Sequence, residues 1–189
     1  GIALGRLGRF LLYRVTLPRA AAVFVQSDRM KQDVAMGGID PAKLHPVPMG
    51  VNTAIDIAAI VPLPHDIYGD AQVLLYVGTL DEARRMEVPA RGAAIVLARR
   101  PGAVLVFIGD SSPAERKAVL APAEELGVAD RVIFRGQMPL EELFRHIRRA
   151  DVCLAPYPVD PPMLASATPT KLIEYAFLGA RVVANRHPD

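Results

Sequence analysis

The chain has 189 residues, of which 51% are hydrophobic, enough to bury a core and to form one domain or one domain plus part of another. Its 22 Lys and Arg residues nearly balance 20 acidic residues, and the net charge of +2 argues against a nucleic-acid partner. Four scattered histidines and one cysteine show no metal-ligand spacing, and no apolar run has transmembrane length. A lone cysteine within an apolar run and no secretory signal favour a cytoplasmic protein.

The N-terminal residues predict a small α/β unit that ends in a linker. The first helix would carry Leu7, Leu11 and Val15 on one face and arginines elsewhere. Such a face suits a membrane surface or, more commonly, packing against a sheet. Residues 53–70 contain prolines and scattered charges and are interpreted as the linker. The expected elements are a helix over Leu4–Leu17, a strand over Ala21–Val25, a helix over Asp28–Met36 with Ser27 as N-cap, and a strand over Leu44–Val47.

After residue 70, apolar strands alternate regularly with helices. This spacing indicates βαβ units with right-handed crossovers, and hence an α/β fold with a doubly wound, Rossmann-like parallel sheet. Ligands bind such sheets beyond the carboxyl ends of the strands. The expected strands are Val73–Val77, Ala103–Ile108, Val132–Phe134, Val152–Ala155 and Arg181–Ala184, and the expected helices are Met86–Arg100, Ala114–Leu126, Leu140–Arg149 and Thr170–Leu178.

The segment from residue 166 to residue 184 is the most informative candidate site. It reads SATPTKLIEYAFLGARVVA, a loop of small residues and proline followed by a helix and a strand. Thr170 and Lys171 lie in the expected first turn, where free backbone N–H groups and the helix dipole attract phosphate. Glu174 lies one turn later and could accept hydrogen bonds from ribose hydroxyls. Ordinary helix capping and a solvated glutamate explain this segment about equally well.

Loops after three other strands add further candidates. Arg84 and Arg85 precede a helix start, where two cations are unfavourable unless an anion lies between them. Gly109 and Gly136 would let a ligand approach the backbone. Asp110 could cap the next helix or face a ligand, Met138 is expected in the core, and Tyr157 is expected to be structural rather than stacked on a ligand.

Missing motifs narrow the possible chemistry. No Walker-type loop, GxGxxG motif or GxSxG elbow follows a strand. No aspartate pair at D-x-D spacing is present to hold a divalent metal on a diphosphate. We therefore expect a bound diphosphate to be neutralised by Arg, Lys and a helix N-terminus, without a metal cofactor.

Taken together, these segments resemble the retaining glycosyltransferases of family 4 (group 1), which have the GT-B fold. LLYVGTLDEARR resembles the first strand and phosphate loop of their C-terminal domain, and VIFRGQMPLEELFRHIRRADVCLAPY resembles their base-binding loop, helix and next strand. The segment from residue 166 resembles the signature with two glutamates, and AAVFVQSDRMKQDV resembles the end of the N-terminal domain. The resemblance implies that residues 1–55 are a remnant of the acceptor domain and that 56–189 are a donor-nucleotide domain truncated at its end.

The resemblance also implies roles for individual residues. Glu174 matches the second glutamate, which holds the ribose, whereas Ser166 replaces the first, which normally touches the donor sugar. Arg84 matches the basic residue on the diphosphate and, with Lys171, would stabilise the leaving group. Thr79 stands where an arginine commonly follows the first glycine. The full set of implied donor-binding residues is Gly78, Thr79, Arg84, Arg85, Gly109, Gly136, Gln137, Met138, Ser166, Thr170, Lys171, Leu172 and Glu174.

The implied reaction is transfer of a sugar, with retention, from a UDP-, GDP- or ADP-sugar to a glycan or lipid-linked acceptor. The resemblance also allows peripheral contact at the inner membrane face. Because the chain starts at Gly1 without Met and stops after a strand, we expect a fragment that binds a nucleotide weakly and transfers no sugar. The alternatives are a sugar-nucleotide epimerase of the same fold and a nucleotide-binding domain without catalysis.

Overall fold

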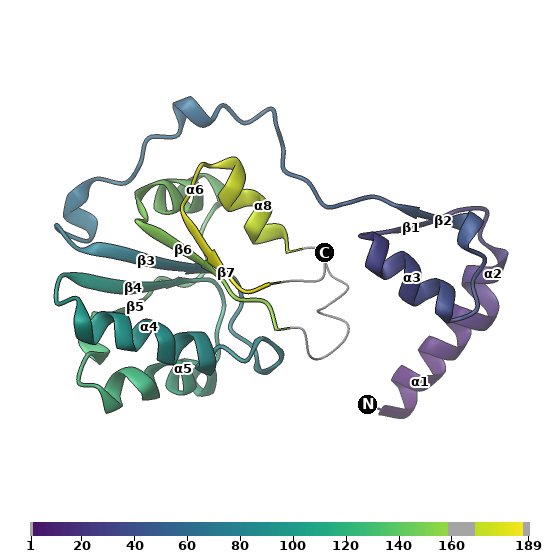
Figure 1. Cartoon of the computed structure of the whole chain (residues 1–189), viewed down its shortest axis with the longest axis horizontal. Helices are drawn as coiled ribbons and strands as arrows, with labels where there is room; N and C mark the ends of the chain where they lie inside the picture. Colours follow the sequence, from purple (N-terminus) through teal and green to yellow (C-terminus); the bar gives the residue numbers. More distant parts are fainter. Residues whose placement is uncertain (1, 159–168, 187–189) are drawn as a thin grey trace. The chain divides into compact units, whose positions relative to one another are not determined.

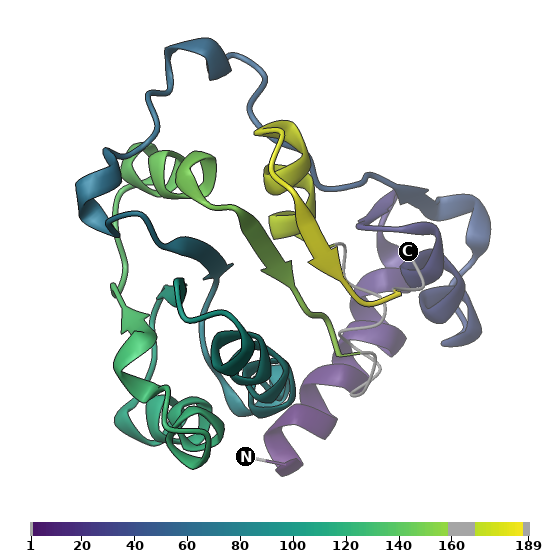
Figure 2. The same ribbon diagram turned by 60° about the vertical axis from the view of Figure 1, so that its left-hand side comes forward.

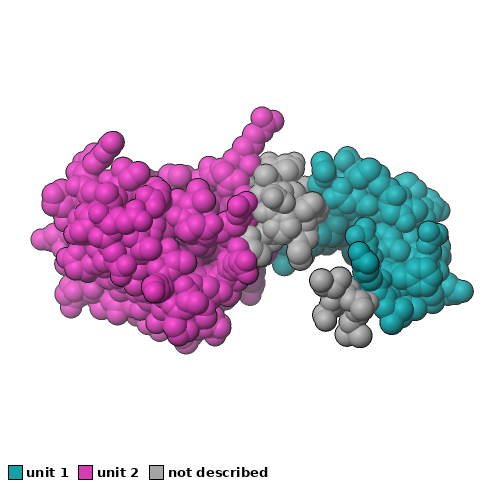
Figure 3. Space-filling model, turned by 90° about the horizontal axis from the view of Figure 1, so that it is seen from below, with its two compact units in different colours: residues 1–50, 159–168, 187–189 teal, residues 51–158, 169–186 magenta. Residues whose placement is uncertain are grey.

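The computed structural model describes residues 2–158 and 169–186. By their contacts, the described residues fall into two compact units, 2–50 and 51–158 together with 169–186, which Figure 3 shows in different colours. Each unit is described by itself. The division falls after Gly50, and the domain boundary expected between residues 55 and 56 stays a prediction.

The first unit is a small α/β arrangement. Helix α1 (Ile2–Leu11) continues through a π-helical stretch (Leu12–Thr16) into α2 (Leu17–Arg19). Strands β1 (Val23–Val25) and β2 (Leu44–Pro46) pair in parallel, and α3 (Asp28–Met36) connects them. The predicted cap of α3 is confirmed, because the Ser27 hydroxyl accepts a hydrogen bond of 3.0 Å from the Met30 N–H.

The apolar face of the first helix is not covered by a sheet, contrary to the more common arrangement expected for it. Leu7, Leu11 and Val15 are 55%, 46% and 42% exposed. The helix instead contacts its own unit through the ring of Tyr13, which lies where a Cβ on Gly37 would be. An aromatic side chain on a glycine thus replaces the expected aliphatic contact.

The second unit is built on a five-stranded parallel sheet with the strand order β5-β4-β3-β6-β7 (Figure 1). The predicted doubly wound topology is confirmed. Nearly continuous Val, Ile, Leu and Phe in β4 leave that strand buried over almost its whole length, as expected for a strand covered on both faces. The strands are β3 (Gln72–Val77), β4 (Ala103–Ile108), β5 (Val132–Phe134), β6 (Val152–Ala155) and β7 (Val182–Ala184).

Within the described ranges, two helices cover each face of this sheet. Helices α4 (Glu87–Arg99) and α5 (Pro113–Glu125) lie on one face, and α6 (Leu140–Arg149) and α8 (Thr170–Phe177) lie on the other (Figures 1 and 2). Helix α6 has the expected bounds, and the other three differ from the expected helices by one residue at one or both ends. No helix within the described ranges is long and apolar enough to cross a membrane.

Residues 51–71 are packed against the second unit rather than forming a free connection. Ile55, Ile57 and Ile60 pack against the same apolar cluster that contains Leu63 and Tyr68. The interpretation as a linker recognised the prolines but missed these apolar side chains, which are spaced too irregularly to suggest a helix or a strand. The segment contains short 3-10 helices at Ile57–Ala59 and His65–Ile67.

The strand order fixes where a ligand can bind. From β3 the chain adds β4 and β5 on one side, and it then returns to add β6 and β7 on the other. The winding direction therefore changes between β3 and β6. In open α/β sheets the crevice beyond the carboxyl ends of the strands at this switch point is the usual ligand site.

Candidate functional site

Three glycines line the carboxyl edge of the sheet, each directly or nearly after a strand. Gly78, Gly109 and Gly136 have φ values of 140°, 143° and 70°. The Gly78 N–H donates to Ile108 O at 2.9 Å, and the Gly109 N–H donates to Gly136 O at 2.9 Å. These bonds extend the β3-β4-β5 pairing into the loops and hold the loops together.

The structure explains the glycine at position 109 by a packing contact, whereas the sequence suggested the approach of a ligand. A Cβ at this position would overlap the carbonyl of Gly78, so the close approach predicted for a ligand is made by the neighbouring loop. Gly136 is different, because a Cβ there would have no neighbour within 4 Å. The space that a Cβ would occupy is therefore open, and the positive φ is what favours glycine here.

Lys171 lies at the switch point with its amine buried. The residue is only 5% exposed, and its Nζ donates a hydrogen bond of 3.0 Å to the Tyr76 hydroxyl. The same Nζ lies 4.1 Å from the centre of the Tyr76 ring and 5.1 Å from that of Tyr157. A Cβ on Gly78 would come within 3.0 Å of Nζ, so this glycine leaves room for the amine.

The charge of Lys171 is poorly compensated. Burial lowers the pKa of its amine to about 7, and the neighbouring Arg84 adds to this effect, whereas Asp81 and Glu174 oppose it. No carboxylate within the described ranges forms a salt bridge with Lys171. A buried amine held by aromatic rings and a phenol, without a carboxylate, is suited to receive an anion from outside.

Arg84 is held in place by Asp81. Its Nε lies 3.0 Å from Asp81 Oδ2, and its backbone N–H donates to Asp81 Oδ1 at 2.9 Å. Asp81 is therefore an anion beside the arginine pair, and the pair alone does not require one from a ligand. Arg85 is exposed and takes a left-handed φ of 47°. Helix α4 begins only at Glu87, an acid in its favourable first turn.

Tyrosine side chains lie around this site, and the sequence pattern did not predict Tyr76 or Tyr175 as part of it. Tyr76 is fully buried, and burial raises the pKa of its phenol to about 12, so the hydroxyl stays neutral. The pairing of β3 with β6 stops at Tyr76 and Leu154, and the next N–H, that of Val77, donates to the Tyr175 hydroxyl at 2.9 Å. A polar residue within the apolar run LLYV was the one signal that could have indicated Tyr76.

Helix α8 presents the other predicted residues from its first two turns. Thr170 and Glu174 are half-buried, and burial raises the pKa of the Glu174 carboxyl against the effect of Lys171. No side chain caps the helix at Pro169. Leu172 packs its side chain against the apolar cluster, which leaves only its backbone for a ligand. Ser166 lies outside the described residues.

The remaining predicted residues occupy the loops that follow β3, β4 and β5. Thr79 and Gln137 are exposed, and Met138 packs against the core as expected. Asp110 does not cap the next helix. Ser112 does so instead, in a capping box with Glu115, because it lies directly before the first helical residue.

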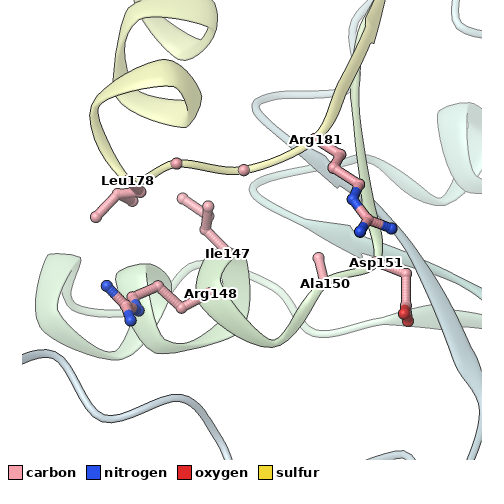
Figure 4. Close-up of a pocket in the computed structure, with 8 residues that line it drawn as sticks. Ile147, Arg148, Ala150, Asp151, Leu178 and Arg181 are labelled. Carbon is pink, nitrogen blue, oxygen red and sulfur yellow. The ribbon is translucent and has the colours of Figure 1, made fainter.

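Two hollows lie away from this crevice. One, of about 340 Å³, is at the amino ends of β6 and β7, where Figure 4 shows Arg148 and Arg181 well apart, and Arg148 already donates to Ile57 O. The other is an apolar groove of about 730 Å³ between α4 and the β6-β7 side of the sheet. Among the described residues, no three His, Cys, Asp or Glu side chains gather as metal ligands would.

Sequence comparison relates the chain to known enzymes. The model of the family "Glycosyl transferases group 1" matches residues 71–189. D-inositol 3-phosphate glycosyltransferase of Acidothermus cellulolyticus is 34% identical over 136 residues, 67% of this chain and 30% of that protein. The enzyme of the same name from Segniliparus rotundus is 30% identical over 62% of this chain and 27% of that protein. The chain thus spans under a third of the length of these relatives.

Solved structures show the same fold. The Anabaena protein HepE in complex with UDP and glucose is 19% identical, with a TM-score of 0.64 over 95% of this chain and 47% of that one. Sucrose-phosphate synthase from Thermosynechococcus elongatus is 24% identical, with a TM-score of 0.67 over 94% of this chain and 44% of that one. These likenesses agree with the GT-B fold that the resemblance implied. With the family model matching from β3 to the last residue, the chain belongs to the group 1 glycosyl transferases.

Proposed function

We propose that the crevice between β3 and β6 binds the diphosphate of a nucleoside-diphosphate sugar. The observation that carries this proposal is Lys171, a buried amine at the switch point with no carboxylate partner among the described residues. Arg84 supplies a second cation nearby, already oriented by Asp81. Both cations lie beyond the carboxyl ends of parallel strands, where such folds bind nucleotides.

The nucleoside would extend from the diphosphate along α8 and the loop after β5. Glu174 lies one turn beyond Lys171 and is half-buried, which suits a carboxylate that accepts hydrogen bonds from ribose hydroxyls. Gly136 and Gln137 face open space or solvent and could contact the base through backbone groups. The complex of HepE with UDP supports a nucleotide in this fold.

In the whole protein, we propose that the sugar passes with retention to a glycan or lipid-linked acceptor. The bond between the sugar and the diphosphate breaks, and negative charge develops on the leaving phosphate. Arg84, Lys171 and the amino end of α8 would stabilise this charge without a metal ion. Preorganised charges of this kind are usually the largest single contribution to catalysis.

Titration of the chain with UDP, GDP and ADP tests the donor site. We expect binding of one of them, weakened about 10-fold in Glu174→Gln, because a neutral amide accepts ribose hydrogen bonds less strongly than a carboxylate. Glu142→Gln, an exposed change on α6, is the matched control and should bind normally. No binding of any of the three at millimolar concentration would rule out the donor site.

A further inference from the structure

The surroundings of the Lys171 amine differ from those of an ordinary phosphate-binding lysine. Such a lysine is usually a hydrated or paired cation, whereas this one is 5% exposed between two tyrosine rings. Its hydrogen-bond acceptor is the neutral hydroxyl of Tyr76. That hydroxyl can accept from either a charged or an uncharged amine, so the contact does not fix the protonation state.

The burial of the amine and the charges around it decide which of the two forms is favoured. Among the described residues, the titratable groups that face it are Tyr76 from β3, Asp81 and Arg84 from the following loop, Tyr157 after β6, and Glu174 on α8. Burial and Arg84 favour the uncharged amine, and its pKa of about 7 leaves it largely uncharged at pH 8. With Lys171 uncharged, two carboxylates face one guanidinium, an unfavourable balance for a doubly negative diphosphate.

We propose that Tyr76 and Tyr157 hold the Lys171 amine out of water, so that a nucleotide sugar binds at this site together with one proton. The inference rests on the donor site proposed above and adds a property of it. The proton comes from water or buffer and adds to the lone pair of Nζ, and no bond of the donor breaks. The diphosphate would place negative charge in direct contact with Nζ, with which no described carboxylate forms a salt bridge, and so would stabilise the ammonium form.

In this arrangement Tyr76 is a positioning residue. Its ring and hydroxyl place Nζ beside Gly78, where the absence of a side chain leaves the approach open. Its own phenol does not titrate in the physiological range, because burial raises its pKa to about 12. Proton uptake is therefore assigned to Lys171.

Calorimetric titration in two buffers of different ionisation enthalpy measures the protons taken up. UDP-glucose, GDP-mannose and ADP-glucose are suitable probes, because their diphosphates carry sugar esters and lack the phosphate group that titrates near pH 6. For the probe that binds, we expect uptake of about 0.9 proton at pH 8 and about 0.1 at pH 6, from an amine with a pKa of about 7 that is charged in the complex.

Two variants separate this linkage from a structural role. Lys171→Arg stays charged at both pH values, so it should bind with uptake close to zero. Tyr76→Phe keeps the ring but removes the acceptor, which disfavours the free ammonium further, so uptake at pH 6 should rise above the wild-type value. Lys117→Met, an exposed change on α5, should leave the uptake unchanged. Circular dichroism shows which variants are folded.

The outcomes are distinct. If none of the three probes binds, the donor site itself is overturned, and this inference with it. If a probe binds with no more uptake at pH 8 than at pH 6, or if Lys171→Arg takes up as many protons as the wild type, the donor site stands and the proton linkage is wrong. Uptake at pH 8 that disappears in Lys171→Arg supports it.

Discussion

A buried cation lies at each end of the sheet, and the two cations have different contacts. At the amino end, the side chain of Arg149 is 8% exposed, and its guanidinium donates to Gly69 O and Ala71 O at 3.2 and 3.3 Å and lies 3.6 Å from Asp151 Oδ2. At the carboxyl end, Lys171 is equally buried, yet its amine meets only a phenol and two aromatic rings among the described residues.

We interpret Arg149 as a structural cation and Lys171 as the binding cation of the proposed donor site. Arg149 joins α6 to the segment before β3, and its partner Asp151 also accepts a hydrogen bond of 2.7 Å from the Val73 N–H. These contacts stabilise the fold, although Arg149 Nε is buried without a hydrogen-bond partner among the described residues. The amine of Lys171 contributes little to stability, because a buried charge without a counter-charge is unfavourable. In the proposed donor site, this amine is the contact for the diphosphate.

The largest expected effect concerns the carboxyl end itself, where a predicted ligand contact is structural. Gly109→Ala would drive a Cβ into the carbonyl of Gly78 at a φ of 143°, so the free energy of unfolding should fall by about 3–5 kcal/mol. Gly136→Ala, with open space around its Cβ, should lose only about 1 kcal/mol. Urea denaturation measures both, and equal losses would show that the loop contact is unimportant.

Arg149→Met should come next in size. It leaves two carbonyls without their donor and Asp151 without its salt-bridge partner, so the free energy of unfolding should fall by about 2 kcal/mol, while the affinity for nucleotide stays the same. Thermal unfolding and calorimetric titration check the two parts. A loss of affinity without a loss of stability would break the distinction between the two ends.

Lys171→Met should give the reverse pattern. Affinity for the nucleotide should fall about 30-fold, because one charged hydrogen bond is lost, while stability near pH 7 should not decrease. In the wild type, a folded pKa of about 7 against an unfolded 10.5 means that the unfolded chain binds more protons between these values, so stability should rise with pH from about 7 to 10. Urea denaturation across this range should show a flatter dependence in Lys171→Met, and an identical slope would contradict the buried, uncharged amine.

The smallest expected effect is a pH dependence of stability that comes from His146, a buried residue of α6. Its Nδ1 lies 2.8 Å from the Tyr68 hydroxyl, and burial, assisted by Arg135, lowers the pKa of its ring below 6.5. The unfolded chain therefore binds this proton more readily, and stability should decrease as the pH falls through about 6.5. His146→Gln should weaken this decrease without changing nucleotide affinity, and an unchanged slope would remove His146 as its cause.

How much of this could be predicted from sequence depends on how local each feature is. The doubly wound sheet could be predicted because apolar runs alternate with helical segments, and this hydrophobic pattern can be recognised in a single sequence. Lys171 and Glu174 were found because they follow a proline at a helix start. The ion pair between Arg84 and Asp81 joins residues only three apart, but the sequence interpretation considered the two adjacent arginines without this carboxylate.

Features that depend on distant partners were out of reach. The phenol of Tyr76 and the amine of Lys171 are 95 residues apart, and no local pattern joins them. The reason for Gly109 is a carbonyl on the neighbouring strand loop, which is known only once the register of β3 and β4 is known. Apolar residues in 51–71 likewise gain their meaning only from the cluster they cover.

A crystal structure of the chain with a bound nucleoside diphosphate would test the proposed donor site most directly. We expect the diphosphate to lie beyond the carboxyl ends of β3 and β6, with an oxygen in hydrogen-bonding contact with Lys171 Nζ and the guanidinium of Arg84 nearby. A diphosphate bound instead at the amino ends of β6 and β7, between Arg148 and Arg181, would contradict it.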